Sequence, residues 1–304
     1  MNSFKNLLCY RFEPDSTLSP ETLEKALSEH PFTPCGRHEL QRSGWVAPCP
    51  FADSLVFTSS GYMLITLLRE ERILPASVIR DEVQERVSRI EATDARKVYK
   101  KEKDQLKDEV VLELLPRAFS KRQSCRALLM PEQGWLLIDS GSFNRGELLL
   151  NALREALGSL KVKPLNVNQA PASVMTQWLQ DINQVSSGFE VDDECELRDT
   201  SAEGGVIRIK GQPLFSDEIR AHLDTDMQVT RLAVTWEEQL SFVLHADLTL
   251  HRLKLTDQYN EQLEHDRPED EVADFDAAVT RMGLEISRLL PALASSFGGE
   301  PVSD

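Results

Sequence analysis

The sequence predicts a mixed fold of the α/β (α+β) class, in which antiparallel sheets carry an inserted segment of long helix. Two short runs of turn residues, Ser59-Ser60-Gly61 and Pro131-Glu132-Gln133-Gly134, each separate a pair of β-rich segments, as in β-hairpins. Apolar residues between Ile79 and Ile90 instead recur at helical spacing. The order strand, strand, helix occurs before and after that helical segment, so we expect two related α/β parts around it.

The first part begins with a strand from Phe4 to Phe12, and Ser19-Pro20-Glu21 is typical of a helix start, here a helix through about Leu27. Short β-rich runs then follow at Trp45 to Pro48, Leu55 to Thr58 and Tyr62 to Leu68.

The segment from Ser77 to Leu115 is interpreted as one long helix or two consecutive helices, including the possibility of a helical hairpin, with Ser77 as a possible cap. The positions Ile79, Val83, Val87 and Ile90 predict a face that packs on a core. Between Thr93 and Lys107 this apolar stripe nearly vanishes, so we expect the middle of the segment to project into solvent.

Strands at Arg126 to Met130 and Trp135 to Asp139 and a helix from Gly146 to Leu157 complete the second part, before a break near Lys163-Pro164. The last region is predicted to contain helices at Ser173 to Leu179 and Ser216 to Leu223, strands at Cys195 to Leu197 and Val206 to Lys210, a meander over Val229 to Trp236, Leu240 to His245 and Leu248 to Leu255, and a terminal helix over about Ala273 to Phe297. The acidic stretches Asp181 to Glu203 and Asp257 to Asp276 are expected to be solvated loops. The predicted domains are 1–75 and 118–165 as two parts of a central α/β domain, 76–117 as a helical tip, and 166–304 as a C-terminal α/β base domain.

Composition limits the possible functions. The chain has 304 residues, a hydrophobic content of 41% and a net charge of −16, and its apolar runs fall short of the roughly 20 residues that cross a bilayer. We therefore expect a cytoplasmic protein without a membrane partner. Its five cysteines are widely spaced with no C-x-x-C pair, which predicts reduced thiols and neither a metal site nor another cofactor.

One segment reverses the acidic character of the chain. Residues 96 to 126 carry ten basic and five acidic side chains, a net charge of +5, so the rest of the chain carries −21. Such a concentration of positive charge favours binding to a polyanion through its phosphates. The basic side chains are Arg96, Lys97, Lys100, Lys101, Lys103, Lys107, Arg117, Lys121, Arg122 and Arg126.

Enzyme motifs are absent from the sequence: it contains no Walker loop, no G-x-G-x-x-G after a strand, no H-E-x-x-H and no G-x-S-x-G. A metal-dependent nuclease would need converging carboxylates and a lysine, and Asp139 with Lys161 or Lys163 is the nearest arrangement. No base-reading motif such as a zinc finger is present either. The sequence therefore favours a non-enzymatic protein that contacts DNA phosphates without sequence preference; a nuclease and a protein-only scaffold are the alternatives.

The sequence resembles the recombination-associated protein RdgC family over nearly its whole length. The resemblance rests on the order and spacing of RKVYKKEKDQLKDE (Arg96 to Glu109), LLPRAF (Leu114 to Phe119), FKNL (Phe4 to Leu7), PFTPCG (Pro31 to Gly36), EERILP (Glu70 to Pro75), LGSL (Leu157 to Leu160), GGVIR (Gly204 to Arg208), RLKL (Arg252 to Leu255) and the Gly-Gly that ends Phe297 to Gly299.

The resemblance implies a horseshoe-shaped subunit that forms a ring-shaped homodimer, with a basic central hole around double-stranded DNA. It also implies association with the nucleoid and restraint of RecA-dependent recombination. On this basis Phe119, Lys210 and Gln212 are expected at the contacts that close the ring. The sequence departs from the family at Ser3, where Trp is usual, and at Gly211, where a basic residue is common. A core position is the alternative for Phe119, because aromatic side chains are often buried.

Overall fold

The computed structural model describes residues 4–13, 18–200, 204–264, 268 and 270–301, and Ser3 lies outside them. The described chain is a mixed α+β protein, as the sequence predicted, with one large antiparallel sheet and a long C-terminal helix. Its α-helices are α1 (Pro20–Ser28), α2 (Ala76–Asp94), α3 (Lys100–Leu114), α4 (Phe143–Leu157), α5 (Pro171–Gln180), α6 (Asp217–Leu223), α7 (Asp257–Glu264) and α8 (Glu271–Ser296). Its strands are β1 (Asn6–Phe12), β2 (Gln41–Val46), β3 (Val56–Ser59), β4 (Tyr62–Ile73), β5 (Phe119–Met130), β6 (Trp135–Ile138), β7 (Val162–Pro164), β8 (Phe189–Asp199), β9 (Val206–Lys210), β10 (Met227–Trp236), β11 (Leu240–His245) and β12 (Leu250–Leu255).

The chain divides into two compact units. Unit 1 comprises residues 1–26, 47–65 and 125–304, and unit 2 comprises residues 27–46 and 66–124. The strands β4 and β5 belong to both units: β4 is divided between them after Ile65, and β5 after Ser124. The predicted four-part division into domains stays a prediction.

The strands follow the hydrogen-bonded order β2-β4-β5-β6-β1-β12-β11-β10-β8-β9, with β3 paired to β4 and β7 paired to β1. Both predicted hairpin turns are confirmed. Ser59 pairs with Tyr62 across a two-residue loop in which Ser60 and Gly61 have φ of 48° and 82°, the backbone conformation of a type I′ turn. The predicted meander is likewise confirmed as β10, β11 and β12.

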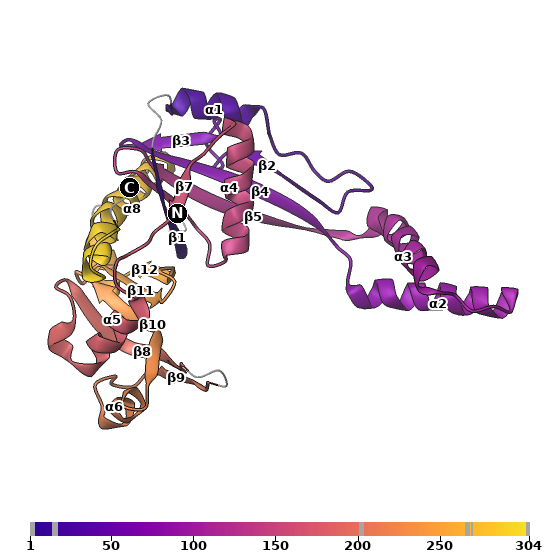
Figure 1. Cartoon of the computed structure of the whole chain (residues 1–304). Helices are drawn as coiled ribbons and strands as arrows, with labels where there is room; N and C mark the ends of the chain where they lie inside the picture. The colour runs from indigo at the N-terminus through magenta and orange to yellow at the C-terminus, as the bar shows by residue number, and fades with distance from the viewer. Residues whose placement is uncertain (1–3, 14–17, 201–203, 265–267, 269, 302–304) are drawn as a thin grey trace. The chain divides into compact units, whose positions relative to one another are not determined.

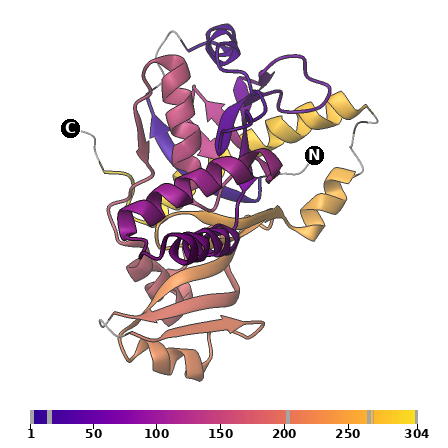
Figure 2. The ribbon, with the colours of Figure 1, turned by 90° about the vertical axis from the view of Figure 1, so that its right-hand side faces the viewer.

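Unit 1 holds the large hydrophobic core, to which the strands and α5, α6 and α8 contribute. The C-terminal helix α8 buries Val279, Ile286 and Leu290. Its Gly283 lies so close to the ring of Tyr62 that a Cβ there would stand 2.2 Å from a ring carbon. Figure 2 shows the strands β10 to β12 (orange) as one continuous sheet with α6 below them.

Unit 2 contains the helical segment, which is a hairpin of α2 and α3 lying side by side (Figure 1). The sequence predicted a helix-spaced face of Ile79, Val83, Val87 and Ile90. The last three pack in the cluster between the two helices, whereas Ile79 is half-buried outside it. Ser77 is not the cap: Pro75 precedes the first helical residue, with the extended backbone of an N-cap and no capping side chain. Proline suits this border because its ring fixes φ and because it has no backbone N–H that would need a hydrogen-bond acceptor.

The acidic stretches are not the solvated loops that the sequence suggested. Residues 189–199 form β8, and the second stretch contributes α7 and the start of α8. In β8 the apolar Phe189, Val191, Cys195 and Leu197 alternate with acidic side chains, so the strand buries one face despite its charge.

Candidate nucleic-acid interface

A small apolar seam holds the helical hairpin of unit 2 together. Val87 on α2, Val98 in the connection and Leu106 on α3 are buried against one another, with half-buried Val83 and Ile90 beside them. Apolar side chains four residues apart on α2 lie one above the other, which is why this seam runs along a single helix face. The seam gives the basic segment a defined conformation.

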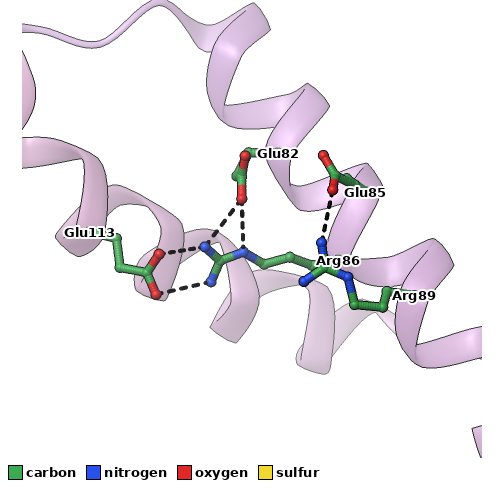
Figure 3. A network of polar contacts seen from close by, with 5 residues as sticks. All are labelled: Glu82, Glu85, Arg86, Arg89 and Glu113. Carbon is green, nitrogen blue, oxygen red and sulfur yellow. Dashed lines mark hydrogen bonds and ion pairs between the residues drawn. The ribbon is translucent and has the colours of Figure 1, made fainter. Parts of the chain in front are cut away.

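Ion pairs fix the two helices beside this seam (Figure 3). The guanidinium of Arg86 on α2 lies 2.5 Å from the carboxylate of Glu113 on α3 and 3.3 Å from Glu82 one turn earlier on its own helix. Arg86 lowers the pKa of Glu113 by hydrogen bonding to its ionised form. On the outer surface of α2, Arg89 pairs with Glu85 at 2.8 Å.

The connection between the helices is also anchored. Ala95 ends α2 with a left-handed backbone, φ 49°, so the chain reverses within a few residues. Arg96 then makes a two-pronged hydrogen bond to Glu102 on α3, at 2.8 and 2.7 Å. The backbone N–H of Val98 donates to Glu91 of α2 at 3.0 Å.

The lysines of the segment are left out of these pairs. Lys97, Lys100, Lys101, Lys103 and Lys107 are exposed, and in the described part of the chain none of them forms an ion pair. The hairpin thus neutralises acidic side chains with arginine, whose planar group suits a two-pronged carboxylate contact, and leaves the lysine charges in solvent. Lys100, Lys103 and Lys107 follow at intervals of three and four residues and so share one face of α3.

The two units differ in net charge. Unit 2 has 16 basic and 14 acidic residues, a net charge of +2, whereas unit 1 has 18 basic and 36 acidic residues, a net charge of −18. A polyanion is therefore repelled by most of the chain and attracted to unit 2.

The other basic candidates occupy different settings. Arg117 and Lys121 are exposed, and Arg117 helps to lower the pKa of Glu113. Arg122 lies 3.1 Å from the buried Glu70 and over the ring of Phe32. Arg126 belongs to unit 1, where its side chain is mostly covered and pairs with Asp139 at 2.7 Å. All ten cations are DNA-binding candidates from the sequence, but in the structure Arg96, Arg122 and Arg126 each pair with a carboxylate of the fold.

Phe119 is not a core residue. Its side chain is 85% exposed at the start of β5, the highest exposure of any large apolar side chain in the described residues. Ser120 and Arg122 interact with Glu70 of β4, so strand alternation places Phe119 on the other face, as it does Ile73, which is 46% exposed. Phe119 therefore holds a large apolar side chain in solvent, outside the hydrophobic clusters of the described chain.

Lys210 and Gln212 are exposed at the end of β9 in unit 1. The Lys210 ammonium lies 3.7 Å from Glu194, which also pairs with Arg252 at 2.6 Å. Gly211 between them has φ +70°, and its N–H donates to the carbonyl of Asp193. A residue with a side chain would be strained in this left-handed conformation, which favours the glycine found at position 211.

One buried charge cluster was missed from the sequence. Glu196 of β8 is 3% exposed and contacts Arg208 at 2.9 Å and Arg231 at 3.3 Å, while Thr230 donates to it. Its pKa is lowered: burial acts to raise it, but the hydrogen bonds from Arg208 and Thr230 and the two arginine charges outweigh burial. Strand alternation provided no signal for it, because Glu196 lies on the face opposite to the buried Cys195 and Leu197. We assign this cluster a structural role, because it joins β8, β9 and β10 and because both oxygens of the Glu196 carboxylate already have partners within the fold.

In the nuclease arrangement considered from the sequence, the carboxylate of Asp139 is already engaged by other groups of the fold. Asp139 accepts hydrogen bonds from the backbone N–H groups of Lys5 at 2.9 Å and Asn6 at 3.3 Å, besides its pair with Arg126. Within the described ranges, no three His, Cys, Asp or Glu side chains lie close enough to hold a metal ion. No helix in the part of the chain that was searched is long and apolar enough to cross a membrane.

These observations define a mixed α+β protein in which an anchored helical hairpin presents a group of exposed lysines without ion pairs. The chain matches the family model described as "RdgC: Putative exonuclease, RdgC" over residues 3–300. It is 48% identical over 302 residues to "Recombination-associated protein RdgC" of Pseudomonas aeruginosa (strain LESB58), covering 98% of both chains. The proteins of the same name from Pseudomonas fluorescens (strain Pf0-1) and Pseudomonas putida (strain GB-1) are 46% and 44% identical; the matches cover 98% of this chain and 97% and 98% of theirs. The chain belongs to the RdgC family of recombination-associated proteins.

Proposed function

We propose that this protein is a non-enzymatic, sequence-independent double-stranded DNA-binding protein that contacts phosphates with the lysines of its helical hairpin. The observation that carries the proposal is the group of exposed lysines without ion pairs, from Lys97 to Lys107, in a net positive unit of a strongly acidic chain. Exposed ammonium groups can exchange counterions for phosphates at little cost, whereas arginines already paired with carboxylates must first give up those contacts.

Phosphate contacts give affinity and position but carry no information about base sequence. We therefore expect similar affinities for unrelated duplexes. If about six to ten phosphates are contacted, affinity should fall roughly 10³- to 10⁵-fold between about 50 and 200 mM salt. A flat salt response or a strong preference for one duplex would contradict this mode of binding.

The double variant Lys97→Glu with Lys101→Glu tests the surface itself. It should weaken duplex binding without loss of helical circular dichroism, because both side chains are exposed and unpaired. Lys161→Glu with Lys163→Glu changes the net charge equally at two exposed positions of unit 1 and serves as the matched control. Equal losses in the two variants would mean that net charge, and not the hairpin, governs binding.

We further propose that two copies form a ring-shaped dimer of horseshoe-shaped subunits that encircles duplex DNA, associates with the nucleoid and restrains RecA-dependent recombination. Family membership and the exposure of Phe119 support this proposal. Burial of an exposed aromatic ring by a second subunit would contribute favourably to dimer formation. Lys210 and Gln212, both exposed in unit 1, are the proposed contacts at the second closure.

Phe119→Ala tests the dimer contact. Since Phe119 is exposed within one subunit, the substitution should leave the melting temperature of the dissociated chain unchanged and shift sedimentation towards monomer or an open form. Phe143→Ala, at a 43% exposed position of α4, is the matched control. An unaltered dimer with a lowered melting temperature would refute the assignment.

A nuclease is the second candidate, because the description of the matching family model reads "Putative exonuclease, RdgC". The two functions differ in one measurement: incubation of end-labelled linear DNA with the purified protein, with and without Mg²⁺. Non-enzymatic binding predicts that the DNA keeps its length. Progressive shortening from the ends that a chelator abolishes would establish the nuclease instead.

A further inference from the structure

Tyr99 stands apart from the other described tyrosines of the chain. Its side chain is 75% exposed, whereas Tyr10 and Tyr62 are buried and Tyr259 donates a hydrogen bond to Glu285. An exposed phenol ring forfeits the stabilisation that burial of an aromatic side chain provides. Nothing within the fold of unit 2 accounts for an aromatic residue at this position.

The backbone on both sides of Tyr99 is held in place. The preceding Val98 is buried in the hairpin seam, and the Tyr99 carbonyl accepts a hydrogen bond from the N–H of Lys103 at 3.0 Å. The ring therefore extends into solvent from a fixed backbone, so only its side-chain rotamers remain to be ordered when a ligand covers it.

The surroundings of Tyr99 are strongly positive. Lys97, Lys100, Lys101 and Lys103 lie within four residues, all exposed and without ion pairs in the described structure. The carboxylates of Asp94 and Glu102 are engaged by Arg96, which leaves Asp104 as the exposed acid nearest in sequence without such a pair. A planar ring amid several cations matches a ligand that combines a flat apolar face with negative charge.

We propose that Tyr99 stacks on an unpaired nucleobase while the neighbouring lysines bind its phosphates, so that the hairpin tip also binds single-stranded or locally unpaired DNA. This inference rests on the proposed DNA-binding function of the hairpin and extends it to another class of nucleic acid. In an intact duplex the base faces are covered by their neighbours, and only an unpaired base offers a face to the ring. Stacking accepts any base, so the contact adds no sequence specificity.

The test compares three fluorescent DNAs of equal length at one salt concentration: a single strand, an intact duplex and a duplex with an internal unpaired stretch. Tyr99→Ala should weaken binding to the single strand and to the interrupted duplex by about 5- to 150-fold, the range for loss of one stacked base. Binding to the intact duplex should change by less than about twofold, since the phosphate contacts remain.

Two further variants sharpen the comparison. Tyr99→Phe keeps the ring and should bind all three DNAs like the parent protein, because stacking does not need the hydroxyl. Leu112→Ala removes an exposed apolar side chain elsewhere on α3 and should change none of the affinities. Circular dichroism confirms that each variant stays folded.

The outcomes separate this inference from the proposed function. If Lys97→Glu with Lys101→Glu loses duplex binding while Tyr99→Ala binds the single strand normally, the stacking role is wrong and the lysine surface stands. Equal weakening on all three DNAs would also overturn it. If Tyr99→Ala alters only self-association in sedimentation, the ring contacts a second copy of the chain instead. A parent protein that binds no DNA would overturn both proposals.

Discussion

Leu106→Ala tests whether the helical hairpin is a local cooperative structure with a stability of its own. Leu106 is one of three buried side chains in the seam between α2 and α3, a cluster separate from the core of unit 1. Removal of three buried carbons at about 0.8 kcal/mol each costs roughly 2.4 kcal/mol. The thin seam can partly collapse around the gap, so we expect a total of about 2–3 kcal/mol, at the low end for leucine in a core.

The assay is native-state hydrogen exchange followed by mass spectrometry. A loss of about 2–3 kcal/mol corresponds to roughly 30- to 150-fold faster exchange through local opening, and it should be confined to peptides from residues 76–114. Peptides from β10 and β11 should exchange as in the parent protein. Leu112→Ala, at an exposed position of the same helix, should leave the hairpin unchanged.

Duplex affinity gives a second readout of the same variant. Opening of the hairpin disperses the lysines that the seam holds in position, so the affinity should fall although no basic residue has been altered. Unchanged exchange in the hairpin, or faster exchange spread evenly over both units, would refute the idea that the seam stabilises this segment locally.

Two further predictions concern unit 1. Burial, followed by the charge of the stacked His251, lowers the pKa of His245 to about 4 from an ordinary 6.5, so the unfolded chain binds the proton first as pH falls. This contribution to the free energy of unfolding is therefore intact above about pH 6.5 and should be lost progressively towards pH 4, by about 1–3 kcal/mol. In urea titrations at several pH values, His245→Gln should reduce the dependence of the unfolding free energy on pH. The same change at the exposed His38 should leave that dependence as it is. Gly283→Ala should lower the free energy of unfolding by about 1–3 kcal/mol, because its Cβ would meet the Tyr62 ring at 2.2 Å, and a melting temperature equal to that of the parent would contradict this packing.

Much of the fold was predictable because its signals are local. The turn Ser60-Gly61 needs positive φ at both positions, and the spacing of Val83, Val87 and Ile90 defines one helix face whatever lies opposite. Only Cys195 to Leu197 of β8 was predicted to be a strand, and the burial of Glu196 within it was not predictable, since arginines on two other strands compensate its charge. Such compensation depends on residues distant in sequence.

The candidate interface was predictable as a segment but not side chain by side chain. A count of charges cannot tell Arg122, which is bound to Glu70, from Lys121, which points into solvent. Nor could the sequence decide whether Phe119 is buried or exposed, because a proline turn followed by a strand suits both positions. These distinctions depend on the partners that each side chain meets in the folded chain.

The hairpin is inserted between β4 and β5, which are neighbours in the sheet. The two ends of the insertion lie close together, because the Arg72 side chain donates a hydrogen bond to the carbonyl of Ala118 at 3.1 Å. A short turn could join the same strands, and the cost of closing a loop grows only slowly with its length. The hairpin can therefore lengthen, shorten or exchange its surface residues over evolution while the sheet keeps its register, so the reach of the basic tip can change without a change of fold.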